Sequence, residues 1–132
     1  MSVATTRGLL LFAHGARDPR WAEPFEAVAA RVRELAPWVV VELGYLELMA
    51  PTVADAGARL ATQGCTRVDV LPLFLGAGGH VRKDVPTMVL ALSEAHPGTE
   101  WHLQRPVGEA ARVIEAMAET AAQLLIPREP TP

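Results

Sequence analysis

The sequence alternates four short apolar runs with four amphipathic segments, and this regular alternation limits the chain to very few folds. The predicted strands cover residues 8–13, 39–45, 68–74 and 100–104. After each of them, apolar residues recur every three or four positions, as on one face of a helix. Strands that alternate with helices over short loops form a parallel sheet covered on both faces. The sequence therefore predicts a single-domain α/β fold, a three-layer sandwich around a four-stranded parallel sheet.

Prolines and polar residues indicate where the predicted helices begin. Pro24 suits the first turn of the first helix, and Pro51 begins the second. Asp84 is expected to cap the third helix. The last helix is expected to bury an inner stripe made of Val113, Ile114, Met117, Ala121 and Leu124.

Length and composition indicate one compact domain and exclude several kinds of partner. A chain of 132 residues is one domain, which we place at residues 1–126, followed by a disordered proline-rich tail at 127–132. The net charge of −3 gives no basic face for nucleic acid. No apolar run approaches the ~20 residues of a membrane span, and residues 9–13 are too few for a signal-peptide core. With Cys65 as its single cysteine, the chain is predicted to be cytoplasmic.

Two histidines and a carboxylate follow the first three predicted strands. His14 comes directly after the first strand, Glu47 after the second, and His80 after a glycine-rich loop that leaves the third. In parallel α/β sheets, ligands bind outside the carboxyl ends of the strands. Each residue alone could be an ordinary loop residue, but imidazole and carboxylate together suit first-row divalent metals. Three protein ligands would leave coordination positions open for exchange.

Other chemistries that use a glycine-rich loop do not match this one. The loop at residues 76–79 lacks the Lys-Ser/Thr of a phosphate-binding P-loop. It also follows the third strand rather than the first, with the wrong spacing for a dinucleotide fingerprint.

Three segments of the sequence resemble the signatures of a known family. The phrases LLLFAHGARDP, ELGYLELMAPTV and VLPLFLGAGGHVRKDVP are similar to those of the small CbiX/SirB-type class II chelatases. That family inserts cobalt, iron or nickel into sirohydrochlorin-type tetrapyrroles without ATP. The resemblance implies that His14 and His80 are metal ligands and proton acceptors, and that Glu47 is the acidic metal ligand. Ala16 stands where the first signature usually has serine.

The resemblance also implies a substrate, a partner and a place in metabolism. Co²⁺, Fe²⁺ or Ni²⁺ would be a substrate for cobalamin or sirohaem biosynthesis, and no cofactor would be permanently bound. Arg17, Arg82 and Lys83 could pair with the carboxylates of the tetrapyrrole, or they could be solvated loop charges. One small domain offers little concavity for a macrocycle, so a homodimer is expected.

Two non-enzymatic hypotheses remain beside the chelatase. The chain could be a metal or tetrapyrrole carrier that uses the same edge of the sheet, a hypothesis to which only Ala16 points. It could also be a structural domain that binds neither metal nor tetrapyrrole.

Overall fold

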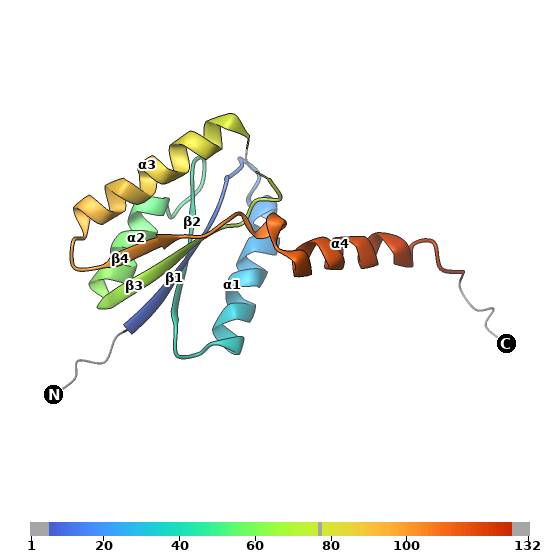
Figure 1. Cartoon of the computed structure of the whole chain (residues 1–132), viewed down its shortest axis with the longest axis horizontal. Helices are drawn as coiled ribbons and strands as arrows, with labels where there is room; N and C mark the ends of the chain where they lie inside the picture. Colours follow the sequence, from blue (N-terminus) through green and yellow to red (C-terminus); the bar gives the residue numbers. More distant parts are fainter. Residues whose placement is uncertain (1–5, 77, 128–132) are drawn as a thin grey trace.

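The predicted four-stranded parallel sheet is the centre of the fold. The computed structural model describes residues 6–76 and 78–127, apart from the side chain of His80. The strands lie in the order β2-β1-β3-β4, and every neighbouring pair is parallel (Figure 1). Their bounds are β1 (Thr6–Ala13), β2 (Val40–Tyr45), β3 (Cys65–Pro72) and β4 (Glu100–Leu103).

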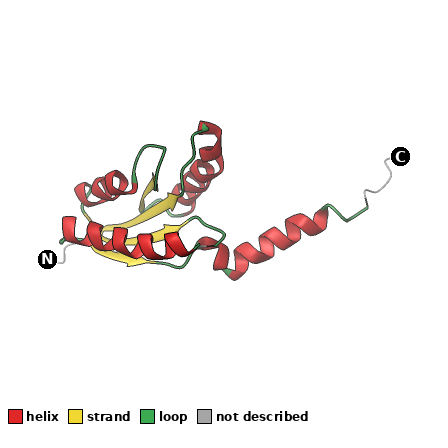
Figure 2. Ribbon diagram, turned by 90° about the horizontal axis from the view of Figure 1, so that it is seen from above, coloured by secondary structure: helices red, strands yellow, loops and turns green. Residues whose placement is uncertain are grey.

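Helices cover both faces of the sheet, but unequally (Figure 2). Because side chains alternate along a strand, Leu10 and Phe12 of β1 face one helix layer and Leu9 and Leu11 face the other. The first layer holds α2 (Val53–Thr62) and α3 (Gly79–Ala95). The second holds α1 (Glu23–Leu35) alone, packed over β1 and β2.

Local signals placed several boundaries correctly. Regular pairing of β3 ends at Pro72, which cannot donate to a ladder. Gly64 follows the end of α2 with a φ of +84°, a conformation that glycine adopts without strain. The start of α2, by contrast, was placed two residues too early at Pro51. The helix begins at Val53, and Thr52 caps it by accepting a hydrogen bond from the backbone N–H of Asp55 at 3.1 Å.

The predicted start of the third helix is wrong. Helix α3 begins at Gly79, with Gly78 as its N-cap, and Asp84 lies inside the helix. Aspartate often caps helices, but the chain is already helical before Asp84, and α3 also holds Pro86 in its interior. The earlier start places His80 in the first turn of α3, directly above the carboxyl edge of the sheet.

The predicted inner stripe of the last helix is also wrong. Helix α4 (Ala111–Gln123) forms as expected, but it projects from the body and has no buried residue (Figures 1 and 2). Ile114, Met117 and Leu124 are 53%, 42% and 86% exposed. Helical periodicity indicates that the stripe lies on one side of α4, but it does not identify what that side packs against.

Two short 3-10 helices complete the description: η1 (Pro19–Ala22) and η2 (Val107–Glu109). Within the described ranges, no helix is both long enough and apolar enough to cross a membrane. The predicted tail lies outside the described residues except for Pro127.

Candidate metal and tetrapyrrole site

The topology brings the three predicted metal-binding residues to one edge of the sheet. His14 follows the last residue of β1, Glu47 lies two residues after the end of β2, and His80 is the second residue of α3. Since β1 lies between β2 and β3, their carboxyl ends are neighbours. The edge where ligands bind in such sheets is therefore the edge that carries these residues.

His14 and Glu47 are in direct contact. The Nε2 atom of His14 lies 3.1 Å from Oε1 of Glu47, although the two residues are 33 positions apart in the sequence. Their side chains are 53% and 58% exposed. A histidine–carboxylate pair from two strands thus faces solvent, where an ion and a large organic ligand can reach it.

Backbone hydrogen bonds beyond the strands hold this pair in place. The Leu46 N–H donates to the Ala13 carbonyl at 3.1 Å, and the Glu47 N–H donates to the His14 carbonyl at 3.1 Å. The loop that carries Glu47 is closed at its base, where the Tyr45 N–H donates to the Pro51 carbonyl at 2.9 Å. The two loops therefore continue the β1–β2 pairing up to the site.

Gly15 is required for this arrangement, and the sequence analysis missed it. Its φ is +98°, and a Cβ atom at this position would lie 1.8 Å from the carbonyl oxygen of Glu47. Any side chain would push the two loops apart. A glycine directly after a histidine was the available signal, but its packing against Glu47 is a tertiary contact that sequence spacing does not reveal.

Beyond Gly15 the chain turns into η1 through a local cap. The carboxylate of Asp18 accepts a hydrogen bond from the Arg20 backbone N–H at 2.9 Å. Hydrogen bonds from the side chain and then the backbone of Arg20 lower the pKa of Asp18 below its ordinary value. The cap fixes the direction in which the chain leaves the His14 loop.

The third loop, between β3 and α3, is anchored at its start. The Gly108 N–H of η2 donates to the Phe74 carbonyl at 2.8 Å, and a Cβ atom on Gly108 would lie 2.2 Å from the Leu75 carbonyl oxygen. Gly76, by contrast, has open space around it. The side chain of His80 is outside the description, and the described side chains include no cluster of three metal-binding groups.

The three predicted substrate-binding residues are exposed but do not form one cluster. Arg17 lies in the loop after His14, whereas Arg82 and Lys83 lie in α3. Arg82 borders an apolar cavity of about 110 Å³ together with Phe74 and Val85. In the part of the chain that the structure describes, none of these three side chains takes part in an ion pair.

Comparison with known proteins identifies the family of the chain. The model of the CbiX family matches residues 8–124. A sirohydrochlorin cobaltochelatase of Methanopyrus kandleri is 36% identical over 61% of this chain and 57% of its own length. One of Sulfurisphaera tokodaii is 28% identical over 89% of this chain and 93% of its own length. A sirohydrochlorin ferrochelatase of Priestia megaterium is 27% identical over 84% of this chain, which spans 42% of that protein.

Solved structures share the fold. A putative cobalamin biosynthesis CbiX protein from Marinobacter aquaeolei VT8 has a TM-score of 0.79 and 35% identity, over 90% of this chain and 97% of that one. SirB from Bacillus subtilis with Fe³⁺ has a TM-score of 0.80 at 23% identity, over 95% of this chain and 50% of that one, which shows the fold alone. The predicted fold class and the resemblance are both confirmed, and the chain belongs to the CbiX family.

Proposed function

We propose that this protein is an enzyme that inserts a divalent metal ion into a sirohydrochlorin-type tetrapyrrole without ATP. The observation that carries the proposal is the exposed His14–Glu47 pair at the carboxyl edge, beside the start of the helix that holds His80. Relatives named as sirohydrochlorin cobaltochelatases and ferrochelatase support the substrate class. The metal, Co²⁺, Fe²⁺ or Ni²⁺, is a substrate in this proposal.

The spacing of the pair suits two ligands of one ion. Ligand atoms about 2.1 Å from a metal and 3.1 Å from each other subtend an angle of about 95° at the ion, close to that of adjacent octahedral ligands. The metal would take the place of the proton that His14 and Glu47 share. Few protein ligands and high exposure favour release, because an ion held too tightly could not pass to the macrocycle.

Metal insertion also needs proton acceptors. Two pyrrole nitrogens must lose their protons as the ion loses its water, and imidazole can accept a proton near neutral pH. We assign this work to His14 and His80, with Glu47 as the anionic ligand that offsets the charge of the ion. His80 belongs to the first turn of α3, which follows β3, and β3 lies on the opposite side of β1 from β2, the strand that leads to Glu47.

The substrate is held by cationic side chains around the edge. Arg17 follows His14 in its loop, and Arg82 and Lys83 follow His80 in α3; their exposure leaves them free to bind ring carboxylates. The cavity of about 110 Å³ that Arg82 borders is smaller than the ~300–1,000 Å³ of typical ligand pockets, and neither His14 nor Glu47 lines it, so we do not assign the macrocycle to it. A homodimer in which two edges together accommodate the macrocycle remains a prediction. A cytoplasmic location remains a prediction.

A metal-insertion assay tests the proposal. Purified protein is mixed with sirohydrochlorin and, separately, with Co²⁺, Fe²⁺ and Ni²⁺, and the change in absorption is compared with the spontaneous rate and with heat-denatured protein. We expect many turnovers per protein chain with at least one metal. Rates equal to the spontaneous rate with all three metals would contradict the proposal.

The carrier hypothesis makes a different prediction in the same assay. Ala16, in place of the usual serine of the first signature, is the one observation that favours it. A carrier would bind metal or tetrapyrrole in a fixed ratio to protein, and product would stop at that ratio. Product formed in large excess over protein would exclude it.

A further inference from the structure

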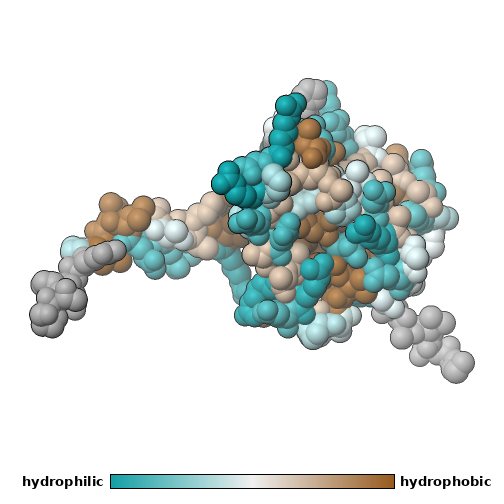
Figure 3. Space-filling model, turned by 180° about the vertical axis from the view of Figure 1, so that it is seen from behind, coloured by the Kyte–Doolittle hydropathy of each residue, from teal (hydrophilic) through white to brown (hydrophobic). Residues whose placement is uncertain are grey.

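Two leucine side chains are exposed in the loops that carry the candidate site. Leu48 follows Glu47 in the loop after β2, and Leu75 lies in the loop between β3 and α3. They are 58% and 69% exposed, and no other large apolar side chain is exposed in the described parts of the loops after β1, β2 and β3. Figure 3 shows hydrophobic surface, in brown, beside hydrophilic groups at the top of the molecule, where these loops lie. Apolar surface therefore occurs at the same edge as the His14–Glu47 pair.

The two leucines have matching positions on either side of the strand that leads to His14. Leu48 lies three residues beyond the end of β2, and Leu75 lies three residues beyond the end of β3. Strands β2 and β3 are the two neighbours of β1. A flat ligand laid over His14 would therefore meet, on each side, a loop that carries an exposed leucine.

The side chains next to these leucines are packed, so the two loops are fixed. Leu46 and Phe74 pack against the core under α2 and α3, and Met49 and Leu73 pack against the core under α1. The ring of Phe74 also meets that of Phe12 edge-to-face, with 5.3 Å between the centroids. Each exposed leucine thus stands on an anchored backbone, rather than at the tip of a loose segment.

The backbone at Leu48 is strained. Its φ is +64°, the one positive φ at a non-glycine residue in the described chain. The Met49 N–H donates to the Glu47 carbonyl at 2.8 Å, which closes a three-residue γ-turn around Leu48. A γ-turn with a positive φ at its centre is the rare and strained form, and glycine or asparagine suits a positive φ better than leucine. Folding alone does not explain an exposed leucine here, because its side chain is not buried in return.

The substrate of the proposed reaction has a surface that fits these side chains. The conjugated ring of a tetrapyrrole has two broad apolar faces, and its carboxylates lie at the rim. Arg17 and Arg82 can bind carboxylates, but exposed ion pairs contribute little affinity and do not fix the tilt of the ring. Apolar contact with a face of the ring adds affinity and fixes the plane of the ring relative to the ion.

We propose that Leu48 and Leu75 contact the faces of the tetrapyrrole ring and hold the ring over the His14–Glu47 pair. The inference rests on the proposed function, because it places the substrate of that reaction. A ring in contact with Leu48 lies next to the anionic metal ligand, since Glu47 and Leu48 share one closed turn. The strained turn presents an apolar side chain at this point, and strain of this kind is typical of ligand-binding positions.

A titration without metal measures the contact. Sirohydrochlorin is titrated with protein, and its change in absorption gives the Kd. Leu48→Asn and Leu75→Asn remove apolar surface at nearly constant size, and each should raise the Kd about tenfold. Leu48→Met keeps the apolar surface and should stay within about threefold of wild type. Leu35 is 61% exposed at the end of α1, away from these loops, so Leu35→Asn is the matched control and should bind as wild type does. An unchanged Kd in either of the first two variants, or an equal loss in Leu35→Asn, would overturn the proposal.

Leu48→Gly separates contact with the ring from a structural role. Glycine adopts a positive φ without strain, so this variant should unfold at the same urea concentration as wild type or a higher one, while its Kd for sirohydrochlorin rises. Unfolding at a lower urea concentration would show that the side chain holds the loop together. A lower mass by light scattering than wild type would show that Leu48 contacts a second copy of the chain. Either result would overturn the assignment to the ring.

Binding and metal insertion, measured together, distinguish this inference from the proposed function. Metal insertion by wild type, with an unchanged Kd in Leu48→Asn, would overturn the leucine contacts alone. Sirohydrochlorin binding that Leu48→Asn weakens, without insertion of any metal by wild type, would overturn the chelatase and support the contacts. Wild-type protein that does not bind sirohydrochlorin would overturn both.

Discussion

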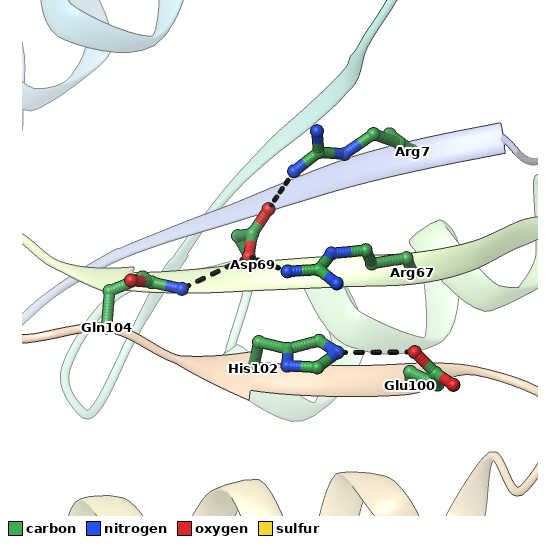
Figure 4. Close-up of polar contacts among 6 residues, drawn as sticks. All are labelled: Arg7, Arg67, Asp69, Glu100, His102 and Gln104. Atoms are coloured by element: carbon green, nitrogen blue, oxygen red, sulfur yellow. Dashed lines mark hydrogen bonds and ion pairs between the residues drawn. The ribbon is translucent and has the colours of Figure 1, made fainter.

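Among the side chains that the structure describes, two histidine–glutamate pairs have similar geometry in very different places. Nε2 of His14 lies 3.1 Å from Oε1 of Glu47. Nε2 of His102 lies 3.3 Å from Oε2 of Glu100, and Figure 4 shows this second pair. The first pair joins the ends of two strands at the carboxyl edge, and each loop is tied to the other by backbone hydrogen bonds. The second pair lies within one strand, two residues apart, on the face of the sheet.

The difference shows that position in the fold, rather than the distance between two side chains, makes a binding site. A pair within β4 results from the alternation of side chains along a strand and needs no other support. The His14–Glu47 pair depends on parallel pairing of β1 with β2 and on a close approach at Gly15. The second pair therefore serves as an internal control for the first.

The largest effect is expected from removing the imidazole at the edge. His14→Ala should lower the rate of metal insertion by about 100-fold or more, since the variant loses a ligand and a proton acceptor. His102→Ala removes the same group from β4 and should change the rate by no more than about twofold. Insertion rates and thermal unfolding of both variants are measured together. Similar losses of insertion rate in both variants would contradict a special role for the histidine at the carboxyl edge.

Gly15→Ala should be the most destabilising of these changes. Its new methyl group would collide with the Glu47 carbonyl in a backbone conformation with a φ of +98°, so we expect the free energy of unfolding to fall by about 2 kcal/mol or more. Gly76→Ala, in the loop after β3, meets open space and should cost less than about 1 kcal/mol. Urea unfolding of both variants measures this. Equal stability would mean that the two loops are not held together at Gly15.

Removal of the negative charge alone should have an intermediate effect. Glu47→Gln keeps the size of the side chain but weakens its hold on a cation, and we expect apparent metal affinity and insertion rate to fall by about tenfold to 100-fold. Glu100→Gln makes the same change in the β4 pair and should leave both quantities within about twofold. Titration with Co²⁺, followed by its visible absorption, gives the affinities. A larger loss of metal affinity in Glu100→Gln than in Glu47→Gln would mean that the metal binds at the His102–Glu100 pair.

The smallest effect concerns the cap that follows the His14 loop. The pKa of Asp18 is lowered in the folded state by its hydrogen bonds to Arg20, so this contribution to stability is present above the ordinary value of 3.8 and is lost as pH falls through the lowered pKa. Asp18→Asn should therefore unfold slightly more easily than the wild type near neutral pH, and the difference should disappear in acid. Thermal unfolding of both proteins, measured from neutral to acidic pH, shows whether the stability difference shrinks as the pH falls. A difference that grows in acid would contradict it.

Residues whose role depends on the local chain were predictable from the sequence. Pro72 ends β3 because it lacks an N–H, and Gly64 closes α2 because it accepts a positive φ. The edge position of His14 and Glu47 also followed, since strand order in a parallel sheet places carboxyl ends together. These features need only the alternation of elements and the chemistry of single residues.

Features that depend on tertiary contact were not predictable. Gly15 is required because Glu47 lies against it, and nothing in the spacing of the two residues indicates this. The stripe of α4 has helical periodicity in the sequence, but the periodicity does not identify its partner, and the described body does not cover it. The start of α3 was placed too late because Asp84 was interpreted as its N-cap, whereas α3 begins at Gly79 and Asp84 lies inside it.

Anomalous diffraction at the cobalt edge, from crystals soaked in Co²⁺, tests the central claim most directly. It locates the ion without relying on activity and compares the two pairs in one map. The account predicts a cobalt peak about 2.1 Å from Nε2 of His14 and from the carboxylate of Glu47. A peak at His102 and Glu100, with none at His14, would contradict it.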